Sequence, residues 1–241
     1  MNQPFEQLLP YVRAIVGSPS DGVVEFIGSA FLCRDAEGIA LITAAHVTDH
    51  LTDKYPLFID RPNEGLVRVC GNIIATKSNI KNRADDKIDI AVIRLKTEIS
   101  KKLSNTPMLE PHQLDINNEC DCSNGFVVVG FPVSKNKHNV KDNNILAMPY
   151  GVCSNEASDE IYSLLGVTKS KHIAIHLNKK EVFSEENNKR NAIGLVGLSG
   201  APVWGVTKEG KGKVVSVLTE HHQKNIKAML TTKINVLYRN E

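Results

Sequence analysis

The sequence predicts an all-β fold made of two halves, each a barrel or a sandwich of short strands. Apolar runs rich in Val, Ile and Phe recur along the chain, and Gly, Asp, Asn or Pro bounds them, which is typical of strands separated by turns. A polar stretch at 99–122 divides these runs into two groups of about six. With 241 residues, of which 41% are hydrophobic, the chain can bury one large core or two compact ones.

The first group of runs occupies residues 1–98, which we expect to form the first domain. β-Branched and aromatic residues pack well on a pleated sheet, so each run is expected to form a strand. The expected strands lie at 11–17, 22–33, 38–47, 55–60, 65–76 and 88–96.

The stretch 99–122 contains Pro107 and Pro111 and has little hydrophobic periodicity, so we expect a linker there. The second group of runs follows in residues 123–241, where we expect the second domain. Its strands are expected at 125–133, 144–153, 171–177, 193–206, 213–222 and 225–237. Short helices are expected at 156–166 and 234–240.

The composition argues against nucleic-acid and membrane partners. The formal net charge is +2, and acids are interspersed among the lysines, which is typical of a solvated surface. No apolar run approaches the roughly 20 residues that span a bilayer. The first residues also lack the basic start, apolar core and small-residue cleavage site of a secretory signal.

The cysteines indicate a reducing compartment. There are five, an odd number, in a chain long enough to fold without disulfide staples. We therefore expect reduced thiols and a cytoplasmic location. Cys120 and Cys122 form a lone C-x-C, and without a second pair we expect neither a metal nor another cofactor. The other three cysteines are Cys33, Cys70 and Cys153.

Ser199 lies in a glycine-rich segment, "GLVGLSGAPVW" at 194–204, that would suit a nucleophile. A serine hydroxyl needs a neighbouring base, the base needs a carboxylate to orient it, and backbone N–H groups must face the oxyanion that forms. Gly197 and Gly200 flank the serine, and glycine allows the backbone conformations that expose such amides. Taken alone, the same pattern is also common in ordinary turns.

His46 is the candidate base. It ends the strand-like run in "ALITAAHVTDH" at 40–50, and Ala44 and Ala45 before it leave room for the imidazole. A lone histidine in this place is also typical of a residue at the boundary of a core.

The segment "ADDKIDIAVIRL" at 84–95 offers three candidate carboxylates. Asp85 and Asp86 are expected in a charged, exposed loop. Asp89 instead begins an apolar alternation, where a buried acid needs a partner because unpaired burial is costly. A histidine N–H would be a suitable partner, so we favour Asp89.

The three segments resemble the catalytic boxes of the chymotrypsin-like (trypsin-like) serine peptidases. "TAAHV", "DIAVIRL" and "GLSGAP" follow that family's order of histidine, aspartate and serine, with separations of the family's scale. "VVVGFP" at 127–132 resembles the opening of the second barrel in bacterial-type members, and "KVVSVLTEHH" at 213–222 resembles the strand that lines the substrate channel. The resemblance covers about residues 11–238. It implies two six-stranded antiparallel barrels with the active site in the cleft between them.

The resemblance also implies roles for individual residues. His46 would be the base, Asp89 would orient it, and Ser199 would be the nucleophile. The N–H groups of Gly197 and Ser199 would form the oxyanion hole. Substrate contacts would come from Ile193, Gly194, Thr219, Glu220 and His221. The remaining histidines are expected mostly at the surface: His50, His112, His138, His172, His176 and His222.

The sequence departs from the secreted members of the family at several positions. Val47 follows His46, and Ile27 stands near where the partner cysteine would be, so the disulfide beside the histidine is missing. Leu198 replaces the aspartate that often precedes the serine. "IVG" at 15–17 resembles the N-terminus of matured members, but without a carboxylate at 198 we expect no processing there.

These observations predict a serine endopeptidase that acts on protein or peptide substrates through an acyl-enzyme and needs no cofactor. Narrow specificity or regulation by a protein partner would restrain such an activity in a cytosol. The alternative is a catalytically inert protease fold used as a binding scaffold. An esterase acting on small acyl groups is a third option.

Overall fold

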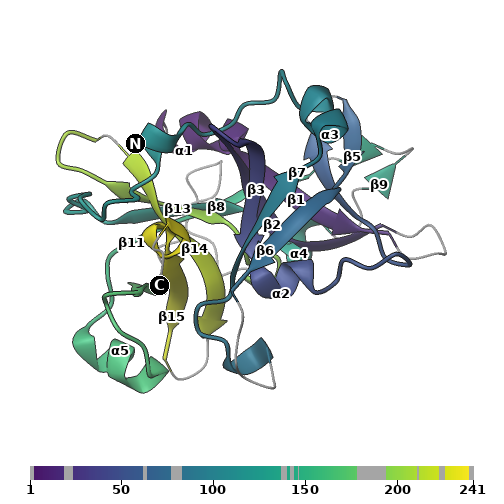
Figure 1. Ribbon diagram of the computed structural model, residues 1–241. Coiled ribbons are helices and arrows are strands. Elements are labelled where there is room, and N and C mark those ends of the chain that lie inside the picture. Colours follow the sequence, from purple (N-terminus) through teal and green to yellow (C-terminus); the bar gives the residue numbers. More distant parts are fainter. Residues whose placement is uncertain are drawn as a thin grey trace.

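Two curled antiparallel sheets make up most of the molecule. The computed structural model describes residues 3–18, 24–61, 64–76, 83–136, 140–141, 144–145, 147–177, 194–210, 212–222 and 226–238. The first half of the chain forms the sheet on the right of Figure 1, and the second half forms the sheet on the left. The predicted all-β fold is confirmed.

The first sheet has seven strands in the order β5-β4-β1-β2-β3-β7-β6, and every pairing is antiparallel. Its strands are β1 (Val12–Gly17), β2 (Glu25–Asp35), β3 (Gly38–Ala44), β4 (Leu57–Arg61), β5 (Gly65–Arg68), β6 (Gly71–Ala75) and β7 (Ile90–Leu95).

The expected strand at 65–76 divides into β5 and β6 at Val69 and Cys70. Both residues stay in the sheet: Val69 N–H donates to Leu57 C=O at 2.8 Å, and Cys70 C=O accepts from Lys96 N–H at 3.0 Å. Because β5 and β6 are the two ends of the sheet order yet follow each other in the chain, the sheet closes into a barrel. Its seven strands come from the six chain segments that the sequence predicts.

The second sheet has six strands in the order β11-β8-β13-β14-β15-β12. The residues after β11 close this barrel, because Asn155 C=O accepts from His176 N–H at 2.9 Å and Ala157 N–H donates to Ala174 C=O at 2.8 Å. Its strands are β8 (Phe126–Gly130), β11 (Tyr150–Ser154), β12 (His172–His176), β13 (Pro202–Val206), β14 (Gly212–His222) and β15 (Ala228–Lys233). A separate pair consists of β9 (Val140–Lys141) and β10 (Asn144–Ile145).

Short helices connect the strands. The helix expected at 156–166 is confirmed as α5, which ends at Gly166 in a left-handed conformation with φ 66°, a common way for a helix to stop. The strand expected at 38–47 ends at Ala44, and the next residues form α2 instead. The helices are α1 (Gln3–Leu8), η1 (Leu9–Tyr11), α2 (Ala45–Thr48), η2 (Arg83–Asp85), α3 (Thr97–Lys102), η3 (Pro111–Gln113), α4 (Val133–Asn136), α5 (Asp159–Leu165) and η4 (Ile234–Tyr238).

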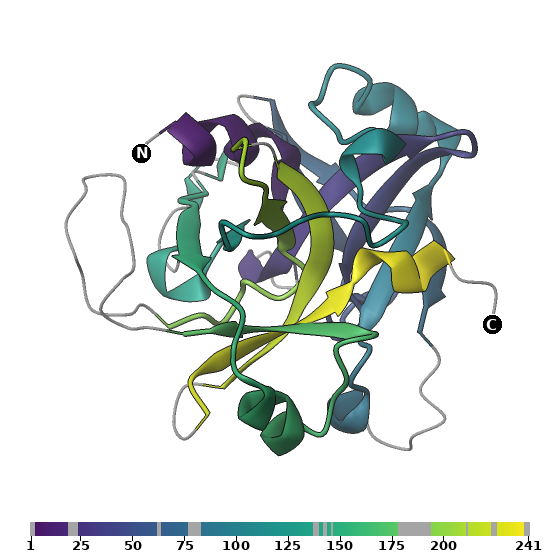
Figure 2. The ribbon, with the colours of Figure 1, turned by 90° about the vertical axis from the view of Figure 1, so that its left-hand side faces the viewer.

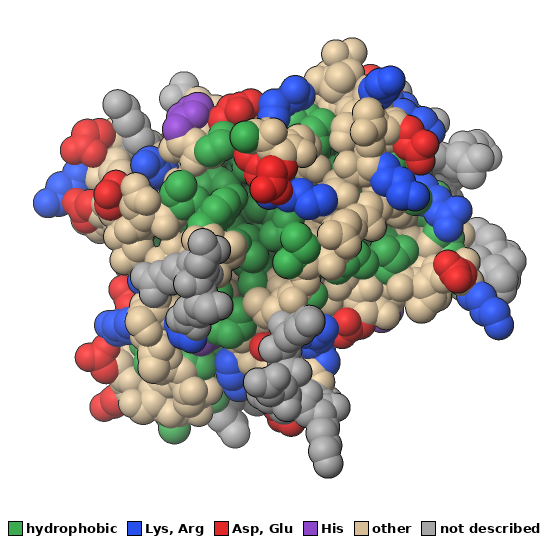
Figure 3. All heavy atoms as spheres, viewed as in Figure 1, with side chains coloured by type: hydrophobic (Ala, Val, Ile, Leu, Met, Phe, Trp, Pro, Cys, Tyr) green, Lys and Arg blue, Asp and Glu red, His purple; other side chains and the backbone are tan. Residues whose placement is uncertain are grey.

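Each barrel has its own apolar interior, and a third cluster joins the two. The joining cluster includes Phe31 from β2, Val129 from β8 and Val217 from β14, all fully buried. Burying such a side chain stabilises the fold by about 1.5–3 kcal/mol, so this cluster contributes to holding the two barrels together. Figure 3 shows apolar side chains across the middle of this face, where the barrels meet, and charged side chains around them.

The two ends of the chain cross to the opposite barrels, as Figure 2 shows. Phe5 of α1 packs against Gly151 of β11, where an added Cβ would lie 2.3 Å from the Phe5 ring. At the other end, burial and the nearby Cys33 and Asp35 of β2 raise the pKa of Tyr238 to about 12. In the described part of the chain, no helix is long and apolar enough to cross a membrane.

Candidate active site

Asp89 holds His46 through two hydrogen bonds. Asp89 Oδ2 lies 2.5 Å from His46 Nδ1, and Asp89 Oδ1 accepts from the His46 backbone N–H at 2.8 Å. The Asp89 side chain is 4% exposed, whereas the His46 side chain is 37% exposed. The buried carboxylate therefore has a partner for each oxygen, and the imidazole keeps one edge open to solvent.

The backbone at Asp89 explains how its carboxylate reaches α2. Asp89 stands directly before β7 and has φ 43°, a left-handed conformation that costs a non-glycine residue about 1–2 kcal/mol. Its C=O accepts from Ala45 N–H at 2.9 Å. Three hydrogen bonds between this residue and the start of α2 thus hold it in the strained conformation, which turns the carboxylate under the histidine.

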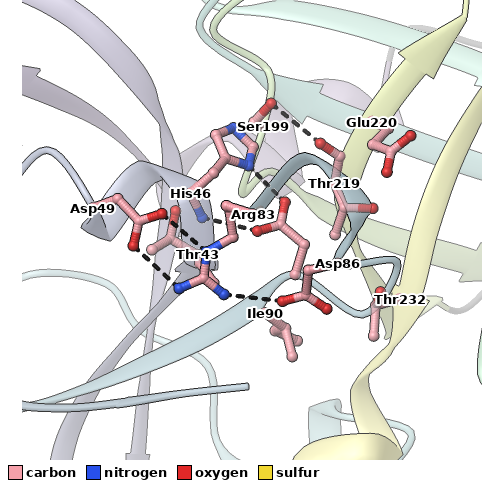
Figure 4. A network of polar contacts seen from close by, with 12 residues as sticks. Thr43, His46, Asp49, Arg83, Asp86, Ile90, Ser199, Thr219, Glu220 and Thr232 are labelled. Atoms are coloured by element: carbon pink, nitrogen blue, oxygen red, sulfur yellow. Dashed lines mark hydrogen bonds and ion pairs between the residues drawn. The ribbon is translucent and has the colours of Figure 1, made fainter. Parts of the chain in front are cut away.

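The loop before Asp89 corrects one prediction from the sequence. Asp85 is exposed as expected, but Asp86 is only 5% exposed. Arg83 binds Asp86 through Nη1 at 2.9 Å and Asp49 through Nε at 2.9 Å and Nη2 at 3.1 Å (Figure 4). Because Asp49 follows α2, Arg83 ties the end of the histidine helix to the aspartate loop.

Two residues of the second barrel hold the same loop from the other side. Thr232 Oγ1 donates to Ile88 C=O at 2.5 Å, and His172 Nε2 lies 3.0 Å from Lys87 C=O. His172 was expected at the surface but is 4% exposed, and burial lowers its pKa. A neutral His172 with its proton on Nε2 can donate to that carbonyl, so both barrels fix the position of Asp89.

Ser199 lies in a turn whose carbonyl groups accept hydrogen bonds from neighbouring residues. Val196 C=O accepts from Val133 N–H at 2.8 Å, and Leu198 C=O accepts from Ala201 N–H at 2.9 Å. A planar trans peptide points its N–H opposite to its C=O. The N–H groups of Gly197 and Ser199 therefore face away from these anchors, and neither donates a hydrogen bond to any described residue.

The glycines of this turn are needed for two reasons. Gly197 has φ 95° and Gly200 has φ 87°, both in the left-handed region that side chains rarely adopt. A Cβ on Gly197 would lie 2.7 Å from Phe131 O, and a Cβ on Gly200 would lie 2.0 Å from Ser29 O. The turn thus lies directly against the end of β8 and against β2 of the first barrel.

Gly200→Ala is expected to lower the free energy of unfolding by about 2–5 kcal/mol, from strain at a positive φ and overpacking against Ser29. Gly210→Ala is the matched control, because Gly210 has φ 74° and nothing within 4 Å of an added Cβ. It should lose only about 1–2 kcal/mol. Urea unfolding of both variants measures the difference, and equal losses would contradict close packing at Gly200.

Ser199 lies next to the helix that carries His46, because a Cβ on Gly28 would be 3.0 Å from Ser199 O and 2.8 Å from Val47 Cγ2. In the view of Figure 4 the Ser199 hydroxyl is drawn close to the His46 imidazole, and no hydrogen bond joins the two. In its present rotamer Oγ donates to Thr219 C=O over 3.4 Å, which is a weak hydrogen bond. Thr219 stands where the pairing of β14 with β15 shifts register, between Leu218 and Glu220. Such a bulge redirects the strand locally, and here it brings a backbone carbonyl to the serine.

The residues expected to contact substrate lie in different surroundings. Ile193 falls outside the described residues, and Gly194 is exposed, with its C=O accepting from Ser134 Oγ at 3.2 Å. The Thr219 side chain is buried, and its hydroxyl donates to Leu230 C=O of β15 at 3.1 Å. This hydroxyl is therefore occupied away from Ser199.

Glu220 is paired on both sides. Its Oε1 lies 3.3 Å from Lys87 Nζ, and its Oε2 lies 3.0 Å from His222 Nε2. His221 is half-buried, and burial, with a smaller effect of His222, lowers its pKa. Glu220 and Lys87 link β14 to the aspartate loop near the site.

These groups form a set suited to acyl transfer. Asp89 holds the base His46, Ser199 lies next to the helix that carries this base, and the N–H groups of Gly197 and Ser199 point away from the hydrogen-bonded carbonyls of their own peptides. Among the described residues, no group of three or more His, Cys, Asp or Glu side chains could hold a metal ion. Ser29, Asp86 and His172 support this set. The sequence did not indicate Ser29, and it led us to expect Asp86 and His172 at the surface. The i, i+3 spacing of Arg83 and Asp86 was the one local signal that could have indicated their ion pair.

A comparison with solved structures finds a similar fold. GrC, which is granzyme C, a chymotrypsin-like serine protease, matches with a TM-score of 0.58 over 95% of this chain and 91% of the GrC chain. The two sequences are 16% identical over this match. No protein-family model and no curated protein matches the sequence. The chain therefore has the chymotrypsin-like fold of two β-barrels, and at this identity the match shows the fold alone.

Proposed function

We propose that this protein is a serine endopeptidase that cuts peptide bonds through an acyl-enzyme, with His46, Asp89 and Ser199 as its catalytic triad. The pair of hydrogen bonds between Asp89 and His46 is the observation that carries the proposal. Ser199 lies next to the helix that carries His46. The N–H groups of Gly197 and Ser199, which donate to no described residue, support it independently.

The proposed reaction begins with attack of Ser199 Oγ on the scissile carbonyl carbon. Asp89 Oδ2 accepts from Nδ1–H of His46, which leaves Nε2 without a proton and able to accept the one from Ser199. His46 then passes this proton to the leaving amine, and water hydrolyses the acyl-enzyme. The Gly197 and Ser199 amides stabilise the oxyanion in each tetrahedral intermediate. No step needs a cofactor.

A binding scaffold with an inert site is the rival from another class. A scaffold has no need of a buried carboxylate paired to a histidine, or of a strained backbone to direct that carboxylate. These costs are expected where the arrangement serves catalysis. An esterase would use the same groups, so the two hydrolases differ in substrate and not in these contacts.

Cleavage of a mixed peptide library, analysed by mass spectrometry, tests the proposal. The protein should release new termini at defined bonds, and Ser199→Ala should release none. A scaffold would bind peptides without cutting them. Turnover of small acyl esters with all peptides left intact would favour the esterase.

For specificity, we predict small or medium apolar residues before the cut. Ile193 and Gly194 would lie at the floor of that pocket, and an apolar floor disfavours a buried cation. Glu220 could have reversed this preference, but Lys87 and His222 already occupy its carboxylate. The same peptide library measures the preference, and a dominant preference for Arg or Lys before the cut would contradict this prediction.

For maturation, we predict that the active protein is uncut between Ala14 and Ile15. This bond lies within β1, which is buried along its whole length and pairs with both β2 and β4. Leu198 is fully buried, so a new ammonium would find no carboxylate at that position. N-terminal mass analysis of the active protein is the check, and activity that appears only after cleavage there would overturn the prediction.

The proposed location is the cytoplasm. All five cysteines are free thiols in the structure, and burial raises the pKa of Cys33 to about 12, so that thiol is poorly reactive. A reducing compartment would keep them in this state. A protease in that compartment would need restraint, which narrow specificity or a protein partner would supply.

A further inference from the structure

Ser29 is a fully buried polar residue that the proposed mechanism does not use. It lies in β2, in the first barrel, where it pairs with Ala14 of β1. Its four hydrogen bonds nevertheless all go to residues close to Ser199 or His46. Its C=O accepts from Thr43 Oγ1 at 2.7 Å, and Thr43 is three residues before His46 on β3.

The side chain of Ser29 joins two segments of the second barrel. Its Oγ donates to Gly197 C=O at 2.8 Å and accepts from Phe131 N–H at 2.9 Å. The hydroxyl therefore uses its donor and an acceptor position on buried backbone groups. Gly130 allows this approach, because a Cβ there would lie 2.8 Å from Ser29 Oγ.

The backbone of Ser29 holds the next peptide of the same turn. Ser29 N–H donates to Ser199 C=O at 2.8 Å. Two carbonyls of the turn, those of Gly197 and Ser199, thus point at one residue of the other barrel. Because a planar peptide joins each C=O to the N–H of the next residue, these two bonds fix the peptides 197–198 and 199–200. The peptide that carries Ser199 N–H lies between these two, and the peptide that carries Gly197 N–H directly precedes the first, so the rotation of both is limited.

Among the described residues, no charged side chain forms a hydrogen bond to this turn. The residue before the nucleophile, Leu198, is fully buried and packs beside Gly130. Its side chain has no polar group that could fix the turn. The polar links from the turn to the described elements around it are therefore neutral. They include the contacts of Ser29, the bond from Val133 N–H to Val196 C=O, and the bond from Gly200 N–H to Leu218 C=O at 2.7 Å.

We propose that Ser29 is a positioning residue that sets the oxyanion hole without a charged anchor, by holding the Gly197 and Ser199 carbonyls. The proposal rests on the function proposed above, since it concerns the same site. Ser29 touches neither the substrate nor the reacting atoms and acts through the turn.

Ser29→Ala tests the proposal, because it removes the hydroxyl and keeps the backbone contacts. Removing one donor of an oxyanion hole costs about 100- to 1000-fold in kcat, so loosening the turn should lower kcat about 10- to 100-fold with KM changed less than about twofold. Affinity for a peptide aldehyde, whose adduct carries an oxyanion, should fall in parallel. Affinity for the matching peptide alcohol should stay the same.

Amide hydrogen exchange gives a readout that does not depend on activity. The N–H groups of Leu198, Gly200 and Ala201 are hydrogen bonded within or next to the turn. They should exchange about tenfold faster in Ser29→Ala, as expected from the loss of a buried hydrogen bond.

Ser216→Ala is the matched control. Ser216 is also fully buried, and its hydroxyl accepts from Thr231 Oγ1 at 2.8 Å, away from the turn. Both variants should lose similar stability, but only Ser29→Ala should change kcat and exchange at 198–201. Equal exchange in the two variants, or no change in Ser29→Ala, would overturn the proposal.

Two further outcomes keep the inference separate from the proposed function. If Ser29→Ala does not fold, Ser29→Cys replaces it, because a thiol fills the space that alanine would leave empty and is a weaker donor than a hydroxyl. Its exchange should rise by less than tenfold, and no rise would overturn the proposal. If the wild-type protein has no turnover, the proposed function fails, and the exchange measurement still decides whether Ser29 fixes the turn.

Discussion

Replacing Ser199 or His46 with alanine is expected to lower turnover by roughly 10⁴ to 10⁶, because members of a triad act as a unit. Without Oγ there is no nucleophile, and without the imidazole nothing accepts the serine proton. The double variant should be no worse than either single variant. Single-turnover measurements on the best peptide from the library give the rates.

These two variants should keep the fold. Ser199 Oγ makes only a weak bond to Thr219 C=O, so little stability depends on the serine hydroxyl. His46→Ala should cost more stability, because the buried Asp89 carboxylate then keeps only its bond from the backbone N–H of residue 46 and that from Ala45 N–H to its C=O. Ser199→Ala should change the free energy of unfolding by less than about 1 kcal/mol. Turnover that survives in folded Ser199→Ala within about tenfold of the wild type would rule out this nucleophile.

Asp89→Asn is expected to cost about 10⁴ in turnover while the chain stays folded. The amide oxygen can still accept from the His46 backbone N–H, as Oδ1 does now at 2.8 Å. The amide nitrogen then faces Nδ1 and must donate to it. The imidazole is forced to carry its proton on Nε2, where it cannot accept from Ser199.

Asp85→Asn and Asp86→Asn are the controls for this assignment. Asp85 is exposed and should give near-wild-type turnover. Asp86 binds Arg83 and Ile88 N–H, so its loss should destabilise the loop and lower turnover less than Asp89→Asn does. If Asp89→Asn kept near-wild-type turnover while Asp85→Asn or Asp86→Asn abolished it, the assigned carboxylate would be wrong.

The sequence predicts the barrels well because their signals are local. Alternating Val, Ile and Phe between turn residues indicate strands wherever they occur, and the helix α5 carries its own stop signal in Gly166. The break between β5 and β6 is harder to predict. The run 65–76 looks continuous, and the bend at Val69 and Cys70 arises from closing the barrel against Leu57 and Lys96.

In the site too, residues within local sequence segments can be predicted, and residues that act through long-range contacts cannot. His46, Asp89 and Ser199 lie in recognisable segments, so the sequence suggests them, and the close pairing of His46 with Asp89 agrees with that suggestion. Ser29 and His172 form contacts across long stretches of chain: Ser29 Oγ bonds Gly197, 168 residues away, and His172 bonds Lys87, 85 residues away. A single sequence carries no local pattern for such contacts.

Asp86 shows why charge alone misleads. It stands in a polar segment and was expected at the surface, yet an ion pair with Arg83 and a bond from Ile88 N–H allow it to be buried. A buried charge is stable only with such partners, and these appear only once the loop has folded.

Labelling with a fluorophosphonate probe tests the proposed enzyme most directly, because only an activated serine reacts with it. The wild-type protein should form one adduct, and mass spectrometry should locate it on Ser199. Ser199→Ala should not be labelled, and Asp89→Asn should react much more slowly. A folded wild-type protein that forms no adduct, or a Ser199→Ala variant labelled as fast as the wild type, would contradict the assignment of Ser199 as the nucleophile.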